Sequence, residues 1–119
     1  MKIEGEGQLL RIFVDETDQW RGQALYQAIV LKAKELGLAG ATVLRGVMGF
    51  GAHSRIHSAK ILQLSEDLPV VIEIVDKADR IQTILPVLEE MVGEGLITLE
   101  KIHVIAYRSN RGSGKDLGR

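Results

Sequence analysis

The chain has 119 residues, 45% of them hydrophobic, and a formal net charge of −1. This length fits one domain with one core, and the near-neutral charge excludes a chain-wide electrostatic attraction to DNA or RNA. Aromatic residues make up only 4% and cysteine is absent, which excludes base-stacking platforms, disulfide scaffolds, iron–sulfur clusters and thiolate zinc sites. The first residues hold no apolar signal segment. We therefore expect one cytoplasmic domain over residues 1–119, with a core over residues 8–108 and no nucleic-acid partner.

The first part of the chain predicts a strand followed by a helix. Residues 9–14 form a short, mostly apolar run that is typical of a buried strand. A helix is expected over residues 20–36, because apolar residues recur there at helical spacing. Thr17 or Asp18 would cap its N-terminus, and Gly37 would follow its C-terminus.

A second strand and a long connection come next. Residues 42–48 are β-branched or apolar for the most part and predict the strand. Residues 49–69 open with Gly-Phe-Gly and form a connection that is unusually long for so small a domain. We expect residues 49–64 to be the most mobile internal segment in the absence of a ligand, because of their length and polar first half.

The second half predicts a strand, a helix and a last strand. Residues 70–75 are apolar and β-branched, and Asp76 is expected to cap the helix that follows them. The apolar residues of this helix keep an i, i+3, i+4, i+7 spacing, and Pro86 is expected to kink it. Residues 97–107 predict the fourth strand, and residues 109–119, rich in glycine, serine and charge, predict a mobile tail.

The order β-α-β-β-α-β predicts a ferredoxin-like α+β fold. In this fold an antiparallel four-stranded sheet carries two helices on one face. The other face then has no helical cover, and we expect Leu9, Phe13, Val71 and Val75 to line it. An apolar sheet face usually needs a partner, so the pattern favours a homo-oligomer.

Two glycine steps adjoin strand ends and are candidates for ligand binding. They are Gly49-Phe50-Gly51 and Gly93-Glu94-Gly95. Glycine lets backbone amides approach an anion closely. A loop hinge at the first step and a helix C-cap at the second explain the same residues, and whether the two steps meet depends on subunit packing.

Basic residues gather toward the C-terminal end of the sequence. They are Lys101, Arg108, Arg111 and Lys115. Such residues could hold phosphate groups, or they could belong to a solvated strand edge and tail.

Histidines offer a different chemistry in the long connection. His53 and His57 have the i, i+4 spacing of helical metal ligands, but the neighbouring glycines and serine disfavour a helix there, and two solvated loop histidines remain the alternative. The sequence has no Gly-x-Ser-x-Gly elbow, no phosphate-binding Walker motif and no suggestive carboxylate pair. We therefore expect no catalytic residues.

Several segments resemble a widespread, uncharacterised prokaryotic family that is classed as PII-like. They are Leu-Arg-Gly-Val-Met-Gly-Phe-Gly at 44–51, Leu-Ser-Glu-Asp-Leu-Pro at 64–69, Val-Val-Ile-Glu-Ile-Val-Asp at 70–76, Ile-Leu-Pro at 84–86 and Met-Val-Gly-Glu-Gly-Leu-Ile at 91–97. The resemblance covers residues 8–107. It implies a homotrimer of ferredoxin-like subunits that acts as a signalling protein and binds an adenine nucleotide (AMP, ADP or ATP) in the clefts between subunits, without a required cofactor.

The resemblance also implies which residues lie near the nucleotide. They are Gly49, Phe50, Gly51, Gly93, Glu94 and Gly95 at the glycine steps, and Lys101, Arg108 and Arg111 at the phosphates. PII proteins continue their Gly-Phe-Gly with Arg-Gln, whereas Ala52 and His53 follow here, so the nucleotide and any second ligand stay open. Gene neighbourhoods in the family suggest a membrane transporter or channel as the regulated partner.

Two further functions remain alternatives at this point. The first is a divalent-metal-binding trimer of the cation-tolerance type, with His53 and His57 as ligands. The second is an enzyme that acts on a small phosphorylated substrate with a histidine as base.

Overall fold

The structure is a computed structural model that describes residues 2–51 and 68–109. Its elements are β1 (Lys2–Asp15), β2 (Gln19–Trp20), β3 (Gln23–Ala24), α1 (Leu25–Glu35), β4 (Thr42–Arg45), β5 (Pro69–Asp76), α2 (Ala78–Met91) and β6 (Leu96–Arg108). The mobility predicted for the long connection and for the tail, and the predictions for His53, His57, Arg111 and Lys115, concern residues outside the described ranges.

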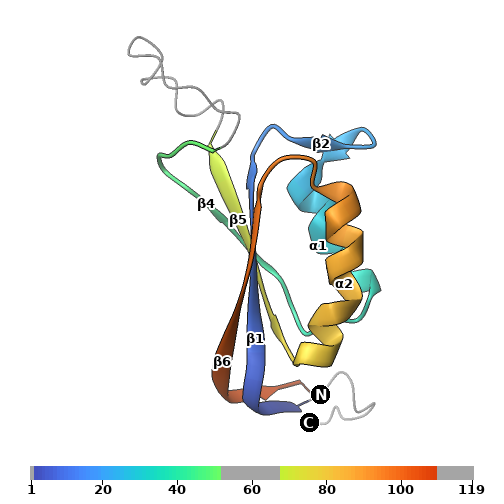
Figure 1. Cartoon of the computed structure of the whole chain (residues 1–119), viewed down its shortest axis with the longest axis vertical. Helices are drawn as coiled ribbons and strands as arrows, with labels where there is room; N and C mark the ends of the chain where they lie inside the picture. Colours follow the sequence, from blue (N-terminus) through green and yellow to red (C-terminus); the bar gives the residue numbers. More distant parts are fainter. Residues whose placement is uncertain (1, 52–67, 110–119) are drawn as a thin grey trace.

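The four long strands form one antiparallel sheet in the order β4-β5-β1-β6. Both helices lie on the same face of this sheet (Figure 1). The ferredoxin-like fold predicted from the sequence is thus confirmed. Its one addition is the short hairpin of β2 and β3, which lies between the first strand and the first helix.

Alternate residues of the central strands form the core under the helices. On β1 and β5 they are Leu10, Ile12, Val14, Val70, Ile72 and Ile74, and from the helices Leu25, Ile29, Ile81, Ile84 and Leu88 join them. Burial of each such side chain stabilises the fold by about 1.5–3 kcal/mol. The period-2 alternation along β1 therefore fixes which face of the sheet the helices cover.

No helix of the described residues lies on the opposite sheet face, as the sequence predicted. Direct pairing of Leu9 with Val75 and of Phe13 with Val71 places all four side chains on this open face. Its middle is charged, because Arg11 donates hydrogen bonds to carboxylate oxygens of two neighbouring strands. The bond to Glu73 measures 2.9 Å and the bond to Glu100 measures 3.0 Å.

The two carboxylates also act on the ionisation of Arg11. The hydrogen bond to Glu73 is the largest effect and raises the pKa of the Arg11 guanidinium above its ordinary value. Desolvation, the next largest effect, opposes this rise, and the charges of Glu73 and Glu100 add to it. Arg11 therefore stays cationic, and the open face is apolar at both ends and ionic between them.

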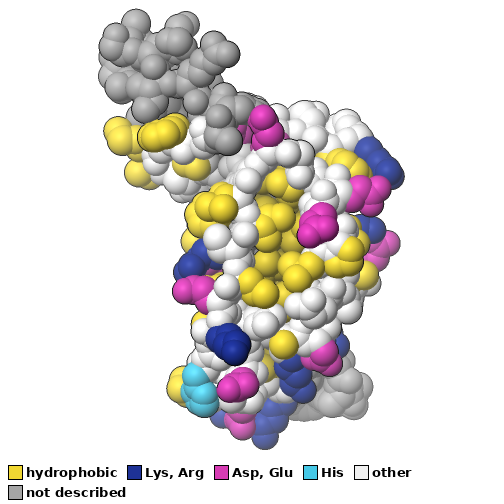
Figure 2. Space-filling view, viewed as in Figure 1, with side chains coloured by type: hydrophobic (Ala, Val, Ile, Leu, Met, Phe, Trp, Pro, Cys, Tyr) yellow, Lys and Arg dark blue, Asp and Glu magenta, His cyan; other side chains and the backbone are white. Residues whose placement is uncertain are grey.

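The edge strand β6 is not covered by the two helices, which pack on the central strands of the sheet. Helix α2 packs on β1 and β5, so hydrophobic side chains remain visible between β6 and α2 (Figure 2). On β6, Leu99 pairs with the fully buried Leu10 but is itself 42% exposed.

Helix α1 begins five residues later than the sequence predicted. The hairpin of β2 and β3 occupies residues 19–24, and α1 starts at Leu25 with Ala24 as an N-cap that makes no side-chain bond. Neither Thr17 nor Asp18 caps the helix, which corrects that prediction. Instead, the carbonyl of Asp18 accepts the backbone N–H of Leu25 at 2.8 Å and closes the base of the hairpin.

The C-terminus of α1 ends as predicted. Gly37 has a φ of 79°, and the N–H groups of Gly37 and Leu38 donate to the carbonyls of Lys34 and Ala33, both at 3.0 Å. This pair of bonds is a Schellman motif, which a residue without a Cβ adopts most easily.

Asp76 has a different role from the helix cap that the sequence predicted, since α2 has Lys77 as its N-cap. Its side chain is fully buried at the end of β5. The carboxylate accepts the N–H of Lys77 at 2.7 Å, the N–H of Ala39 at 2.9 Å and the Nε–H of Arg80 at 3.1 Å. Arg80 in turn donates to the carbonyl of Gly37. Asp76 thus ties the connection between α1 and β4 to the first turn of α2.

We predict that Asp76→Ala lowers the free energy of unfolding by about 2–4 kcal/mol, because buried N–H donors lose their acceptor. Urea denaturation followed by circular dichroism measures this. Asp79→Ala is the matched control, since Asp79 is exposed in the first turn of α2 and should cost less than about 1 kcal/mol. Equal losses in the two variants would show that Asp76 does not tie these segments together.

Candidate functional site

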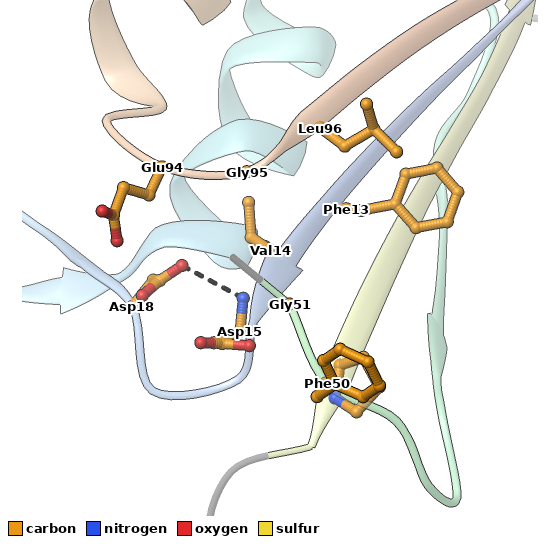
Figure 3. A pocket seen from close by; sticks show the side chains of 10 residues that line it. Phe13, Val14, Asp15, Asp18, Phe50, Gly51, Glu94, Gly95 and Leu96 are labelled. Carbon is orange, nitrogen blue, oxygen red and sulfur yellow. Dashed lines mark hydrogen bonds between the residues drawn. The ribbon is translucent and has the colours of Figure 1, made fainter. Parts of the chain in front are cut away.

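A cavity of about 390 Å³ opens where β1 ends, β6 begins and the chain enters the long connection (Figure 3). Phe50 and Gly51 line it from the start of the connection, and Glu94 and Gly95 line it from the turn before β6. Parts of both glycine steps therefore meet within one subunit, which the sequence alone left open.

The remaining glycines of the two steps lie beside the cavity without lining it. A Cβ on Gly49 would lie 3.0 Å from the Pro69 ring, whereas a Cβ on Gly93 would meet nothing within 4 Å. The turn before β6 thus depends on only one of its glycines. At Gly95 a Cβ would lie 2.6 Å from the carbonyl oxygen of Phe13, so that position cannot hold a side chain without a shift of backbone.

The cavity has an apolar side and an acidic side. Phe13, Phe50 and Leu96 form the apolar side, and Asp15, Asp18 and Glu94 form the acidic side (Figure 3). Asp15 is almost buried, with 9% of its surface exposed, and its backbone N–H donates to Oδ2 of Asp18 at 3.0 Å. No lysine or arginine is among the described lining residues. The apolar side suits an aromatic ring, and the carboxylates suit hydroxyl or cationic groups.

Two of the basic residues predicted from the resemblance, Lys101 and Arg108, lie elsewhere in the chain. Lys101 pairs with Gln8, and Arg108 pairs with Lys2 at the far end of the sheet. At about 3.3 Å per residue, Lys101 is roughly 17 Å and Arg108 roughly 40 Å along β6 from Leu96. Arg111 lies outside the described residues. Within one chain, Lys101 and Arg108 therefore lie far along β6 from the cavity.

The stem of the long connection is fixed next to the cavity. The N–H of Glu16 donates to the carbonyl of Leu68 at 2.9 Å, and its carboxylate accepts the Arg45 guanidinium at 2.8 Å. The N–H of Gly46 donates to the carbonyl of Pro69 at 2.8 Å. Strand β4 therefore ends at Arg45 rather than at residue 48 as predicted, and both ends of the connection are held beside the end of β1.

Sequence reasoning missed the lining residues that come from β1 and its end. Phe13 was expected only on the open sheet face and Asp18 only as a helix cap, while Asp15 and Leu96 carried no signal of their own. The apolar face that contains Phe13 does end at the cavity, since Phe13 pairs with Leu96 and Val71.

Residues 2–51 and 68–109 contain neither a metal-binding cluster nor a membrane-spanning helix. These residues hold no group of three His, Asp or Glu side chains that could bind a metal ion. They also contain no helix with the length and apolar character that a membrane crossing requires. The two histidines of the metal-binding alternative lie outside these ranges.

Comparisons with known proteins identify relatives and fold neighbours. The sequence profile of the DUF190 family, described as "Uncharacterized ACR, COG1993", matches residues 7–104. A UPF0166 protein of Aquifex aeolicus is 44% identical over 99 residues, which covers 82% of this chain and 91% of that protein. Among solved structures, CPII of Thiomonas intermedia, bound to ADP, AMP and acetate, superposes with a TM-score of 0.61 at 14% identity, covering 84% of this chain and 89% of CPII.

A second solved structure shows the same fold. It is a putative PII-like signaling protein of Thermus thermophilus, with a TM-score of 0.58 at 17% identity, covering 85% of this chain and 91% of that protein. At these identities the likeness establishes a PII-like fold and no more.

We predict that Gly95→Ala destabilises the protein by about 1–3 kcal/mol, because the new methyl group must displace the backbone of Phe13. Gly93→Ala, two residues away in the same turn, should change stability by less than about 0.5 kcal/mol because the space around it is open. Thermal unfolding of both variants tests the pair. Equal effects would mean that the close approach between Gly95 and β1 does not shape the site.

Proposed function

Because the chain belongs to the DUF190 family and has a PII-like fold, we propose that it is a cytoplasmic PII-like signalling protein rather than an enzyme. Its ligand is an adenine nucleotide, bound in clefts between the subunits of a homotrimer. A membrane transporter or channel is the proposed target, on the resemblance set out above.

The meeting of the two glycine steps in one cavity carries this proposal. Phe50 and Gly51 come from one step and Glu94 and Gly95 from the other, although they are more than forty residues apart in the sequence. The apolar side of the cavity suits an adenine ring, and the carboxylates suit ribose hydroxyls. The volume of about 390 Å³ lies within the usual range of small-molecule sites. The bound ADP and AMP of CPII, a fold neighbour, favour the same class of ligand.

The open sheet face supports the proposed assembly. Leu44, Val71, Phe13 and Leu96 are adjacent across the four strands of this face, and Leu44 and Leu96 are 48% and 55% exposed. Burial of this apolar row against copies of itself would remove it from water. The resemblance to PII proteins favours three copies, and a neighbouring subunit is the source from which Lys101 or Arg108 can reach the cavity.

We predict that AMP, ADP or ATP binds in the micromolar range by isothermal titration calorimetry and is recovered unchanged. Phe50→Ala should weaken binding about tenfold, because it removes part of the apolar side of the cavity. Val47→Ala is the matched control, since Val47 is 87% exposed and does not line the cavity. The absence of binding below millimolar concentration, or equal affinities in both variants, would reject this site; turnover of the nucleotide would favour an enzyme.

We predict that the wild type has the mass of three chains by light scattering at micromolar concentration. Leu44→Asp should shift it toward monomers, because it places a charge in the apolar row of the open face. Leu31→Asp provides the control, since Leu31 is similarly exposed, at 56%, but belongs to the helical side. A stable wild-type monomer would contradict the assembly, and dissociation in both variants would contradict the assignment of the face.

A further inference from the structure

The proposed function does not say which residues of the chain bind the phosphates of the nucleotide, since the cavity is lined by carboxylates. The carboxylates of Asp15, Asp18 and Glu94 line one side of it, and a phosphate chain placed against them would be repelled. The lysine and arginine of β6 lie roughly 17 and 40 Å away along the strand. A cation just beyond the acidic side would hold the phosphates of a nucleotide whose nucleoside part occupies the cavity.

The hairpin of β2 and β3 begins on that acidic side. Asp18 lines the cavity, and its carbonyl accepts the N–H of Leu25, so the two ends of the hairpin are joined beside the cavity wall. Arg21 occupies the tip of the hairpin, three residues after Asp18. A chain of three residues spans at most about 11 Å, which places Arg21 much closer to the acidic side than either basic residue of β6.

Arg21 has an unusual backbone conformation. Its φ is 50°, and the φ of Gly22 is 85°, as a two-residue type I′ turn requires. Asparagine, aspartate and glycine are the residues that suit the first position of this turn, whereas arginine is strained there. A residue that persists in a strained conformation points to a function for its side chain.

The side chain of Arg21 is held in place but not neutralised. Its guanidinium carbon lies 4.9 Å from the centroid of the Trp20 ring, and Trp20 packs on the core. Arg21 is exposed and pairs with no carboxylate of residues 2–51 and 68–109. A guanidinium that is oriented by an aromatic face and still has its donors free is suited to bind a phosphate group.

We propose that Arg21 binds the phosphate chain of the nucleotide whose nucleoside part occupies the cavity. The inference rests on the proposed function and deepens it, because it separates the part of the site common to all adenine nucleotides from the part that reads the phosphates. Adenosine would be held by the cavity alone, whereas ADP and ATP would gain affinity from Arg21.

The experiment compares adenosine, ADP and ATP by calorimetry in the wild type and in Arg21→Asn. This change removes the charge and supplies a residue that suits the turn. We expect the ratio of the ADP affinity to the adenosine affinity to fall about tenfold while adenosine binds as in the wild type. The melting temperature should equal or exceed that of the wild type, because the strain is relieved. Arg21→Lys should keep part of the ratio, and Lys34→Asn, which removes an exposed cation of α1, should keep all of it.

Four outcomes would overturn the inference. An unchanged ratio in Arg21→Asn, with a lower ratio in Lys101→Ala or Arg108→Ala, would assign the phosphates to β6 of a neighbouring subunit. An unchanged ratio in all of these variants would leave Arg21 with no part in binding. A parallel loss of adenosine and ADP affinity would show that Arg21 shapes the cavity rather than binding phosphate. A wild type that binds neither adenosine nor ADP would reject the proposed function, and this inference with it. The first three outcomes would reject only the role of Arg21.

Discussion

The register of β1 between its two neighbours is the constraint on which the rest of the structure depends. β1 is the central strand that pairs with both β5 and β6, and a slip of one residue would move Leu10, Ile12 and Val14 from the helices to the open face. The same register sets Pro69 opposite Asp15 and Leu96 opposite Phe13. It thereby brings the stem of the long connection and the turn before β6 to one end of the sheet. The core and the candidate site are two consequences of one alignment.

The fold could be predicted from local pattern because each element carries its own periodicity. Alternation on the strands and the apolar stripe of α2 located the four sheet strands and both helices, and Gly37 marked the end of α1. The start of β1 was placed at residue 9, whereas the strand begins at Lys2. The hairpin at residues 19–24 was missed, because its few apolar residues also fit a helical stripe and the Arg21-Gly22 turn lacks the usual asparagine. Asp76 was interpreted as a cap because its position just before a helix is typical of one, whereas its partner Ala39 lies 37 residues away in the sequence.

The site was only half predictable, for a related reason. Both glycine steps were recognised as flexible turns beside strand ends, but their meeting follows from the long-range register of β1. The distance of Lys101 and Arg108 from the cavity follows from the length of β6, which extends 13 residues in one nearly continuous strand. A family resemblance indicates which residues of this chain match those that bind phosphate in relatives. It does not indicate whether these residues face the cavity of their own chain or that of a neighbouring copy. The acidic character of the cavity likewise could not be seen, since Asp15, Asp18 and Glu94 come together only when β1 and the turn before β6 are joined.

A sensor that distinguishes nucleotides by their phosphates needs different affinities for AMP, ADP and ATP, and a high affinity for all three is not enough. The nucleoside is common to AMP, ADP and ATP, so contacts to it raise the affinity for all three without separating them. Discrimination requires charged groups that lie outside the nucleoside cavity and meet only the variable part of the ligand. In this chain carboxylates line the cavity, while Arg21 lies at the hairpin tip and Lys101 and Arg108 lie along β6. With Arg21 on the phosphates, as proposed, the base and the phosphates are held by different parts of the chain, and the response depends on phosphate number through Arg21.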